Sequence, residues 1–90
     1  MKYRFKATPS FRKALGKLTA AQKESAARAF AIFKADPFDP RLRTHKIHGL
    51  SVRFGRTIYS VWVEADLRAV FYLDGDLVVS VDIGSHSIYR

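Results

Sequence analysis

The chain has 90 residues, 48% of them hydrophobic, and carries 16 Lys and Arg against 8 Asp and Glu, a formal net charge of +8. This length allows one small domain, and this apolar fraction excludes a disordered basic tail. The absence of cysteine excludes disulfides, thiolate metal sites and a cysteine nucleophile. We expect a single domain over residues 1–90. We also expect a cytoplasmic location, because the sequence has no apolar run of membrane-spanning length and a charged N-terminus unlike a signal peptide.

The positive charge is concentrated in the first half of the chain. Residues 1–50 hold 12 Lys and Arg and 3 Asp and Glu, whereas residues 51–90 hold 4 and 5. Such asymmetry predicts a polyanionic target, with nucleic acid first, or an acidic protein partner. A net charge that only maintains solubility is the alternative. We favour the polyanionic target.

The first elements are a strand and a short helix. Residues 2–7 alternate between apolar and basic side chains, the pattern of a half-buried strand. Thr8 followed by Pro9 is typical of a helix start, with an N-cap and then proline in the first turn. Phe11, Leu15 and Leu18 follow at the spacing of one helical face.

A second helix is predicted from Thr19. Thr19 and Gln22 match a capping box, and Ala26, Phe30 and Phe33 form an apolar stripe. The short joint between the helices predicts a helical hairpin. The Asp36-Pro37 pair ends the second helix, because the residue before a proline avoids the α region.

Residues 41–56 are basic and look like a loop. They hold five Lys and Arg, two His and no acidic residue. The only regular structure that we expect there is a short strand near residues 50–54.

Three strands follow, over residues 57–64, 67–73 and 77–83, joined by turns at Ala65-Asp66 and Asp74-Gly75-Asp76. The order predicts an α+β domain: an N-terminal strand, a helical hairpin, then three to four mostly antiparallel strands, with the helices packed on one face of the sheet.

Few arrangements in this sequence carry chemistry. It has no glycine-rich phosphate loop, and its acidic pairs flank hairpin turns, where acids are usually turn formers. We expect no metal and no other cofactor, since His45 and His48 lie among positive charges that repel a dication. What remains is a group of Lys and Arg residues, histidines and aromatic residues. Such a group suits metal-free RNA cleavage, in which histidine transfers protons and arginine binds phosphate. Each of these residues taken singly also fits an ordinary surface role.

Five segments resemble, in order and spacing, the RelE/ParE superfamily of toxins from bacterial toxin–antitoxin pairs. They are the F-x-x-x-L-x-x-L helix start, the D-P after the second helix, the H-K-I-x-G segment from His45, the L-R-A-V-F-Y strand from Leu67, and the closing I-G-S-H-S-I-Y. The last of these and the V-E-x-D turn from Val63 to Asp66 are similar to the YafQ branch. The resemblance covers nearly the whole chain.

The resemblance implies a role for each candidate site residue. His86 matches the main general acid or base, Arg68 the arginine that supports the scissile phosphate, and Tyr89 the C-terminal aromatic that orients the substrate. His45 matches a loop histidine of the YafQ branch, and Lys46 lies near the catalytic lysines of RelE. We expect the basic segment to bind RNA through Arg43, His48, Arg53 and Arg56.

The sequence also departs from the YafQ pattern. Trp62 stands where that branch has a histidine, and Leu67 where it has a tryptophan. Asp66 matches a functional aspartate of the branch, and a turn-forming role explains it equally well. The partner of His86 in proton transfer is therefore either His45 or His48.

The activity implied is that of a ribosome-dependent mRNA endoribonuclease that acts in the ribosomal A site and inhibits translation. The implied partners are the ribosome, mRNA, an acidic antitoxin and, through the antitoxin, operator DNA. Two alternatives share the fold: a ParE-like inhibitor of DNA gyrase, and a degenerate member that only binds its antitoxin.

Overall fold

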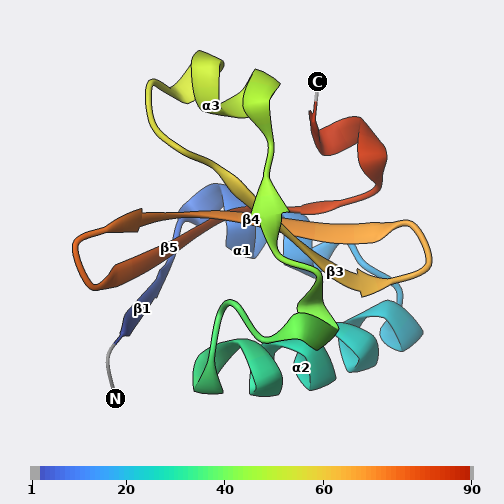
Figure 1. The fold of residues 1–90 in the computed structure, drawn as a ribbon. Helices are drawn as coiled ribbons and strands as arrows, with labels where there is room; N and C mark the ends of the chain where they lie inside the picture. Colours follow the sequence, from blue (N-terminus) through green and yellow to red (C-terminus); the bar gives the residue numbers. More distant parts are fainter. Residues whose placement is uncertain (1–2, 90) are drawn as a thin grey trace.

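The structure is a computed structural model that describes residues 3–89, apart from the side chain of His86. Its centre is a five-stranded sheet in the order β1-β5-β4-β3-β2 (Figure 1). β1 runs parallel to β5, and the other neighbours are antiparallel. The strands are β1 (Arg4–Ala7), β2 (His45–Lys46), β3 (Tyr59–Glu64), β4 (Leu67–Asp74) and β5 (Leu77–Gly84). The predicted α+β class and N-terminal strand are confirmed.

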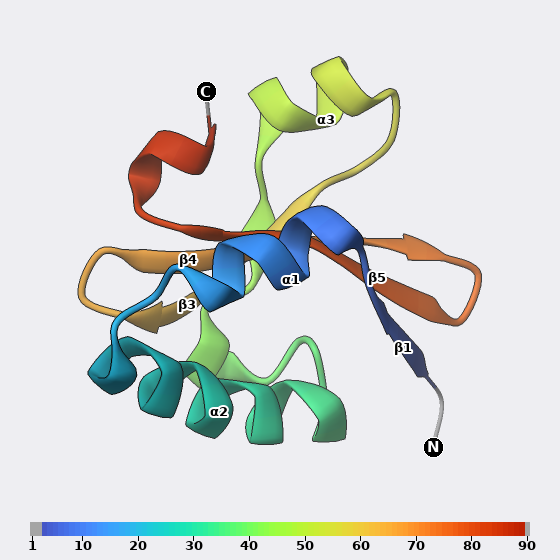
Figure 2. The same cartoon turned by 180° about the vertical axis from the view of Figure 1, so that it is seen from behind.

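The two predicted helices form where their capping residues place them. α1 (Pro9–Gly16) begins after Thr8, whose side chain accepts a hydrogen bond from the Phe11 amide. α2 (Ala20–Ala35) begins after Thr19 with both hydrogen bonds of the capping box to Gln22. The two helices form a hairpin (Figure 2). None of the helices in the described range is long and apolar enough to cross a membrane.

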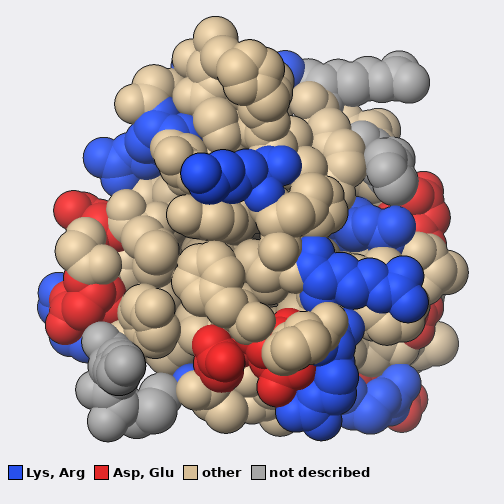
Figure 3. Space-filling view, in the orientation of Figure 1, with Lys and Arg blue, Asp and Glu red and all other residues tan. Residues whose placement is uncertain are grey.

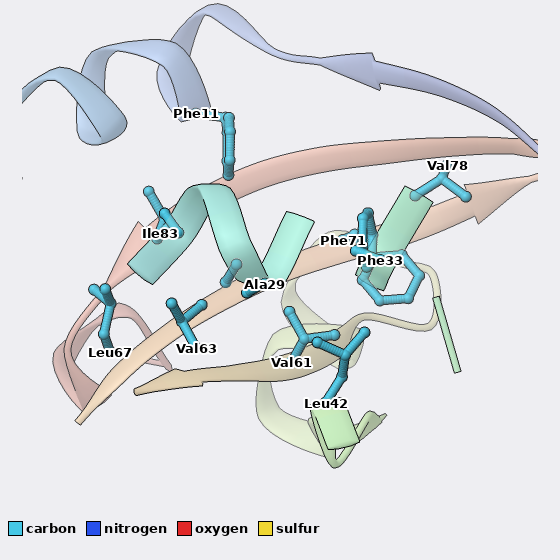
Figure 4. Close-up of a cluster of buried hydrophobic side chains, with 12 residues drawn as sticks. Phe11, Ala29, Phe33, Leu42, Val61, Val63, Leu67, Phe71, Val78 and Ile83 are labelled. Atoms are coloured by element: carbon cyan, nitrogen blue, oxygen red, sulfur yellow. The ribbon is translucent and has the colours of Figure 1, made fainter. Parts of the chain in front are cut away.

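The main core lies between this hairpin and one face of the sheet, here called the α2 face. Phe33 of α2 meets Phe71 of β4 edge to face, with ring centroids 5.0 Å apart. Tyr59 stacks on the same Phe71 ring at 5.2 Å. Figure 4 shows the buried side chains of the hairpin and the strands pointing toward one another. The predicted packing of the hairpin on one face of the sheet is confirmed.

The opposite face of the sheet, here called the α3 face, is covered in part by two short elements. α3 (His48–Phe54) and the 3₁₀ helix η2 (His86–Tyr89) lie on this side (Figures 1 and 2). A second apolar cluster joins them to the sheet. Its buried members are Leu50, Ile58 and Val70, and its half-buried members are Ile47, Tyr72, Val81, Ile88 and Tyr89.

The expectation of a loop with a short strand near residues 50–54 is wrong. The structure has a 3₁₀ helix at Pro40–Leu42, the strand β2 at His45–Lys46, and α3 over residues 48–54. α3 has seven residues, too few to show a helical period, and its first two, His and Gly, have low helix propensity. Packing and a hydrogen bond outside the helix hold it instead: Leu50 is buried with Ile58 and Val70, and the Ser51 hydroxyl, which donates to the Ile47 carbonyl, accepts from the Ile58 amide. The helix ends at Gly55, whose φ of 69° lies in the left-handed region.

Two aliphatic side chains of α3 test whether burial holds this helix on the sheet. Leu50 is 2% exposed and Val52 is 68% exposed. We predict that Leu50→Ala lowers the free energy of unfolding by about 2–5 kcal/mol, because it removes buried contacts and leaves a cavity. Val52→Ala, the matched control, should change it by less than about 0.5 kcal/mol. Urea denaturation measures both. Equal losses for the two variants would contradict this packing.

The C-terminal η2 folds back over the end of β5. A Cβ atom on Gly84 would lie 2.8 Å from the Ile88 side chain, so glycine allows this close approach. The hydroxyl of Tyr89 forms a 2.5 Å hydrogen bond with the hydroxyl of Ser60, which is fully buried in β3. This bond ties the C-terminal segment to the middle of the sheet.

The Tyr89–Ser60 bond is testable as a structural tie. We predict that Tyr89→Phe lowers the free energy of unfolding by about 1 kcal/mol, because Ser60 loses its partner in a buried position. Ser60→Ala should have an effect of similar size. The double variant should lose less than the sum of the two, since both single changes remove one bond. Additive losses in urea denaturation would show that the two hydroxyls act independently.

Candidate functional site

A β-bulge in β3 decides which side chains share the α3 face. At the turn, Glu64 pairs with Leu67, but the next pair is Trp62 with Arg68, so Val63 is the extra residue. Side chains of directly opposed residues lie on the same face of a sheet. Without the bulge, Trp62 would oppose Ala69, whose side chain lies in the core of the α2 face. The bulge therefore brings Trp62 to the same face as Arg68.

His45 reaches this face from the neighbouring edge strand. It pairs with Ser60, which in turn pairs with Val70, and Val70 pairs with Asp82 of β5. Ser60 bonds Tyr89 of η2, so this row of side chains lies on the α3 face. His45 is exposed, and its Nδ1 lies 2.8 Å from the carbonyl oxygen of Arg43.

Trp62 and Arg68 share one acceptor at the β3–β4 turn. The Trp62 indole donates to the Ala65 carbonyl at 3.1 Å, and Arg68 Nη1 donates to the same oxygen at 2.7 Å. Arg68 Nη1 also lies 3.3 Å from the carbonyl of Leu67. The Arg43 guanidinium lies over the Trp62 ring, 4.7 Å from its centroid, in a cation–π contact. Two arginines are thus gathered around one half-buried indole.

A second cation–π pair lies farther along β4. The Arg56 guanidinium is 4.2 Å from the centroid of the Tyr72 ring. Tyr72 and Arg68 are four residues apart on one strand face, about 13 Å. Between α3, η2 and the start of α1 lies an open groove of about 680 Å³, lined by Arg53, Tyr72, Asp82 and neighbouring apolar and hydroxyl side chains. This face thus combines arginines with aromatic rings and hydroxyls, the groups that bind phosphate and stack on bases.

The structure does not gather all the predicted site residues on this face. Lys46 pairs with Tyr59, which packs in the core of the α2 face, so Lys46 lies on the opposite side of β2 from His45.

His48 is exposed at the first turn of α3. The side chain of His86 lies outside the described residues, and its backbone begins η2, two residues beyond Gly84, which pairs with Arg68. Asp66 is exposed in the β3–β4 turn.

The basic segment is not uniformly available for a ligand. The guanidinium of Arg41 forms two hydrogen bonds with the carboxylate of Asp39. The hydrogen bond from Arg41 holds the pKa of Asp39 below its ordinary value. Figure 3 shows Lys and Arg bordering the region between α3 and the sheet and continuing toward the β3–β4 turn, with Asp and Glu at the β4–β5 turn, at the lower centre and along the right edge of the view.

Sequence reasoning missed two aromatic members of the site, Trp62 and Tyr72. The alternation along β4 already placed Tyr72 on the same side as Arg68, and that signal was available. The alternation along β3 likewise placed Trp62 on the side opposite Tyr59, Val61 and Val63, and the bulge then sets it directly across from Arg68. Among the described residues, no three His, Asp or Glu side chains lie close enough together to hold a metal ion.

Comparison with known proteins finds similarity in structure only. No family model matches the sequence, and no curated protein matches it. RelE in its complex with RelB from Pyrococcus horikoshii OT3 superposes with a TM-score of 0.71 at 19% identity, covering 94% of this chain and 96% of that one. YafQ from E. coli strain BL21(DE3) gives 0.70 at 14% identity, covering 96% of both chains.

Two further structures agree. YafQ in the E. coli DinJ–YafQ toxin–antitoxin complex has a TM-score of 0.63 at 14% identity, covering 98% of this chain and 97% of that one. The solution structure of HP0894 from Helicobacter pylori has 0.61 at 18% identity, covering 94% and 96%. The matches span nearly the full length of each chain. The chain therefore has the fold of the RelE and YafQ toxins.

Proposed function

We propose that this protein is the toxin of a bacterial type II toxin–antitoxin pair and acts as a ribosome-dependent mRNA endoribonuclease. The observation that carries the proposal is the α3 face, where Arg68 and Trp62 share the Ala65 carbonyl, the Arg43 guanidinium lies over the Trp62 ring, and His45 meets the Arg43 carbonyl. The RelE/YafQ fold supports the same assignment.

The proposed reaction needs no group beyond the chain and its RNA substrate. The 2′-oxygen of a ribose attacks the adjacent phosphorus while its proton passes to a base. The bond from phosphorus to the 5′-oxygen breaks as that oxygen takes a proton from an acid. The products are a 2′,3′-cyclic phosphate and a 5′-hydroxyl. Histidine titrates near neutral pH and serves in either proton transfer.

In this reaction His86 and His45 form the acid–base pair. His45 is preferred to His48 as the partner of His86, since its paired position on β2 puts it on the face of Arg68. Arg68 supports the negative charge that develops on the phosphate. Tyr89 orients the RNA with its aromatic ring, which is held in place by the hydrogen bond between its hydroxyl and Ser60. Lys46 belongs to the surrounding RNA contact rather than to the reacting atoms.

The charge distribution supports the proposed partners. The basic segment that contains Arg43, His48, Arg53 and Arg56 binds the RNA of the ribosomal A site and its mRNA, and such contacts weaken as salt rises. An acidic antitoxin neutralises the same charge and links the toxin indirectly to operator DNA. RelE and YafQ have been seen in complexes with RelB and DinJ. The location proposed is the cytoplasm, where ribosomes translate.

Replacing His86 separates this function from its alternatives. We predict that induction of the wild-type protein in a bacterial host arrests growth and translation, and that His86→Gln reduces mRNA cleavage by about 10²–10⁴-fold. Binding to an acidic antitoxin, measured by calorimetry, should persist in the variant.

Other outcomes point elsewhere. Undiminished toxicity of His86→Gln with altered DNA supercoiling would identify a gyrase inhibitor. The absence of growth arrest by the wild type would identify a protein that only binds its antitoxin.

Two arginines offer a matched pair for the phosphate contact. We predict that Arg68→Ala reduces cleavage on translating ribosomes by about 10²–10³-fold, because it removes a charged donor from the developing phosphorane. Arg41→Ala removes an equal charge that is bound to Asp39, and should leave the rate within about threefold. Similar losses in both variants would show that only overall charge matters.

A further inference from the structure

We infer that Trp62 is a positioning residue that holds both Arg68 and the Arg43–His45 pair in their working arrangement. The inference rests on the proposed function. It adds a residue that takes no part in the proton transfers and does not contact the scissile phosphate. Trp62 is the member of the α3 face that touches both halves of the site: its ring lies under Arg43 and its indole nitrogen meets the carbonyl that binds Arg68.

Arg68 is held through a carbonyl that it shares with Trp62. Its Nη1 donates to the carbonyl of Ala65, which also accepts the Trp62 indole hydrogen. Ala65 has a φ of 38°, a left-handed conformation that is uncommon for alanine. The indole bond stabilises the turn in this conformation and so keeps the shared oxygen in place. The guanidinium of Arg68 is thereby held at the β3–β4 turn through Nη1.

Trp62 also acts on His45, through Arg43. A carbonyl oxygen only accepts hydrogen bonds, so the contact with Arg43 requires that Nδ1 of His45 carries the hydrogen. In the neutral ring, Nε2 then holds the lone pair and can accept a proton. The Arg43 backbone is left-handed, with φ of 50° and ψ of 39°. The stack of its guanidinium on Trp62 fixes this residue and, with it, the carbonyl that selects the tautomer.

Together these contacts assign the two ends of the proton transfer. His45 acts as the base that takes the proton of the 2′-hydroxyl on Nε2, and His86 is left as the acid for the 5′-oxygen. Tryptophan suits position 62 because it supplies two things at once: a large π face for Arg43 and an N–H donor for the Ala65 carbonyl. Phenylalanine retains the first alone, and leucine retains neither.

Two variants therefore separate the two contacts. In Trp62→Phe, the tautomer of His45 should be unchanged. Cleavage should fall about fivefold, because the Ala65 carbonyl that accepts from Arg68 is no longer held in place by the indole hydrogen bond. In Trp62→Leu, nitrogen-15 chemical shifts of the imidazole should show that His45 loses its preference for hydrogen on Nδ1. Cleavage should then fall by about 10²-fold, as expected for misplaced catalytic groups. Phe38→Leu, which alters an aromatic residue of the α2 face, is the control for general loosening.

The tautomer measurement distinguishes failure of the inference from failure of the proposed function. If the wild type cleaves no RNA, the proposed function fails, and the nitrogen shifts still decide whether Trp62 controls His45. An unchanged tautomer in a folded Trp62→Leu protein overturns the inference, whatever the activity. Circular dichroism confirms that each variant is folded before its shifts are compared.

Discussion

The arrangement of the α3 face depends on one extra residue in β3. Side chains alternate between the two faces along a strand. The extra residue Val63 therefore reverses the face on which every earlier residue of β3 lies, compared with a regular pairing to β4. The shift buries Tyr59 and Val61 against α2, and it turns Ser60 and Trp62 toward α3. The core contact of Tyr59 with Phe71 and the pairing of Trp62 with Arg68 are thus two results of the same register. A change of register along this strand would therefore alter the hydrophobic core and the proposed catalytic face together.

The parts of the fold with strong local signals were predictable from the sequence. Thr8-Pro9 and the Thr19–Gln22 capping box set the helix starts, and alternation set the three long strands. α3 was missed because its seven residues are too few to show a helical period and because it is held by the packing of Leu50 with the distant Val70. For the site, the resemblance pointed to Arg68 and His45, and the pairing of strands puts them on one face. The same pairing separates Lys46 from them, because adjacent residues in a strand point to opposite faces. Trp62 was noted only as a departure from a pattern. Alternation already put it on the side away from the apolar residues of its strand, but its direct pairing with Arg68 depends on the bulge.

The excess positive charge of the first half of the chain lies on particular elements of the fold. The first half of the chain supplies β1, α1 and α2, whose Lys and Arg are mostly exposed, and then the basic segment that leads into α3. The second half supplies the strands that hold Arg68 and the buried rings. Arg43 and Arg56 lie between these parts, each over an aromatic ring of the sheet. A polyanion bound along this border would contact fixed guanidinium groups, which lose less conformational freedom on binding than lysines in open solvent.

The central claim is that this face cleaves mRNA by attack of the 2′-hydroxyl while ribosomes translate it. The most direct measurement is the chemistry and position of new RNA ends in cells after brief induction of the wild-type protein. The account predicts 5′-hydroxyl ends and matching 2′,3′-cyclic phosphates inside translated reading frames, which disappear when translation is blocked beforehand. New ends that carry 5′-phosphates, or arrest of growth with intact mRNA, would contradict it.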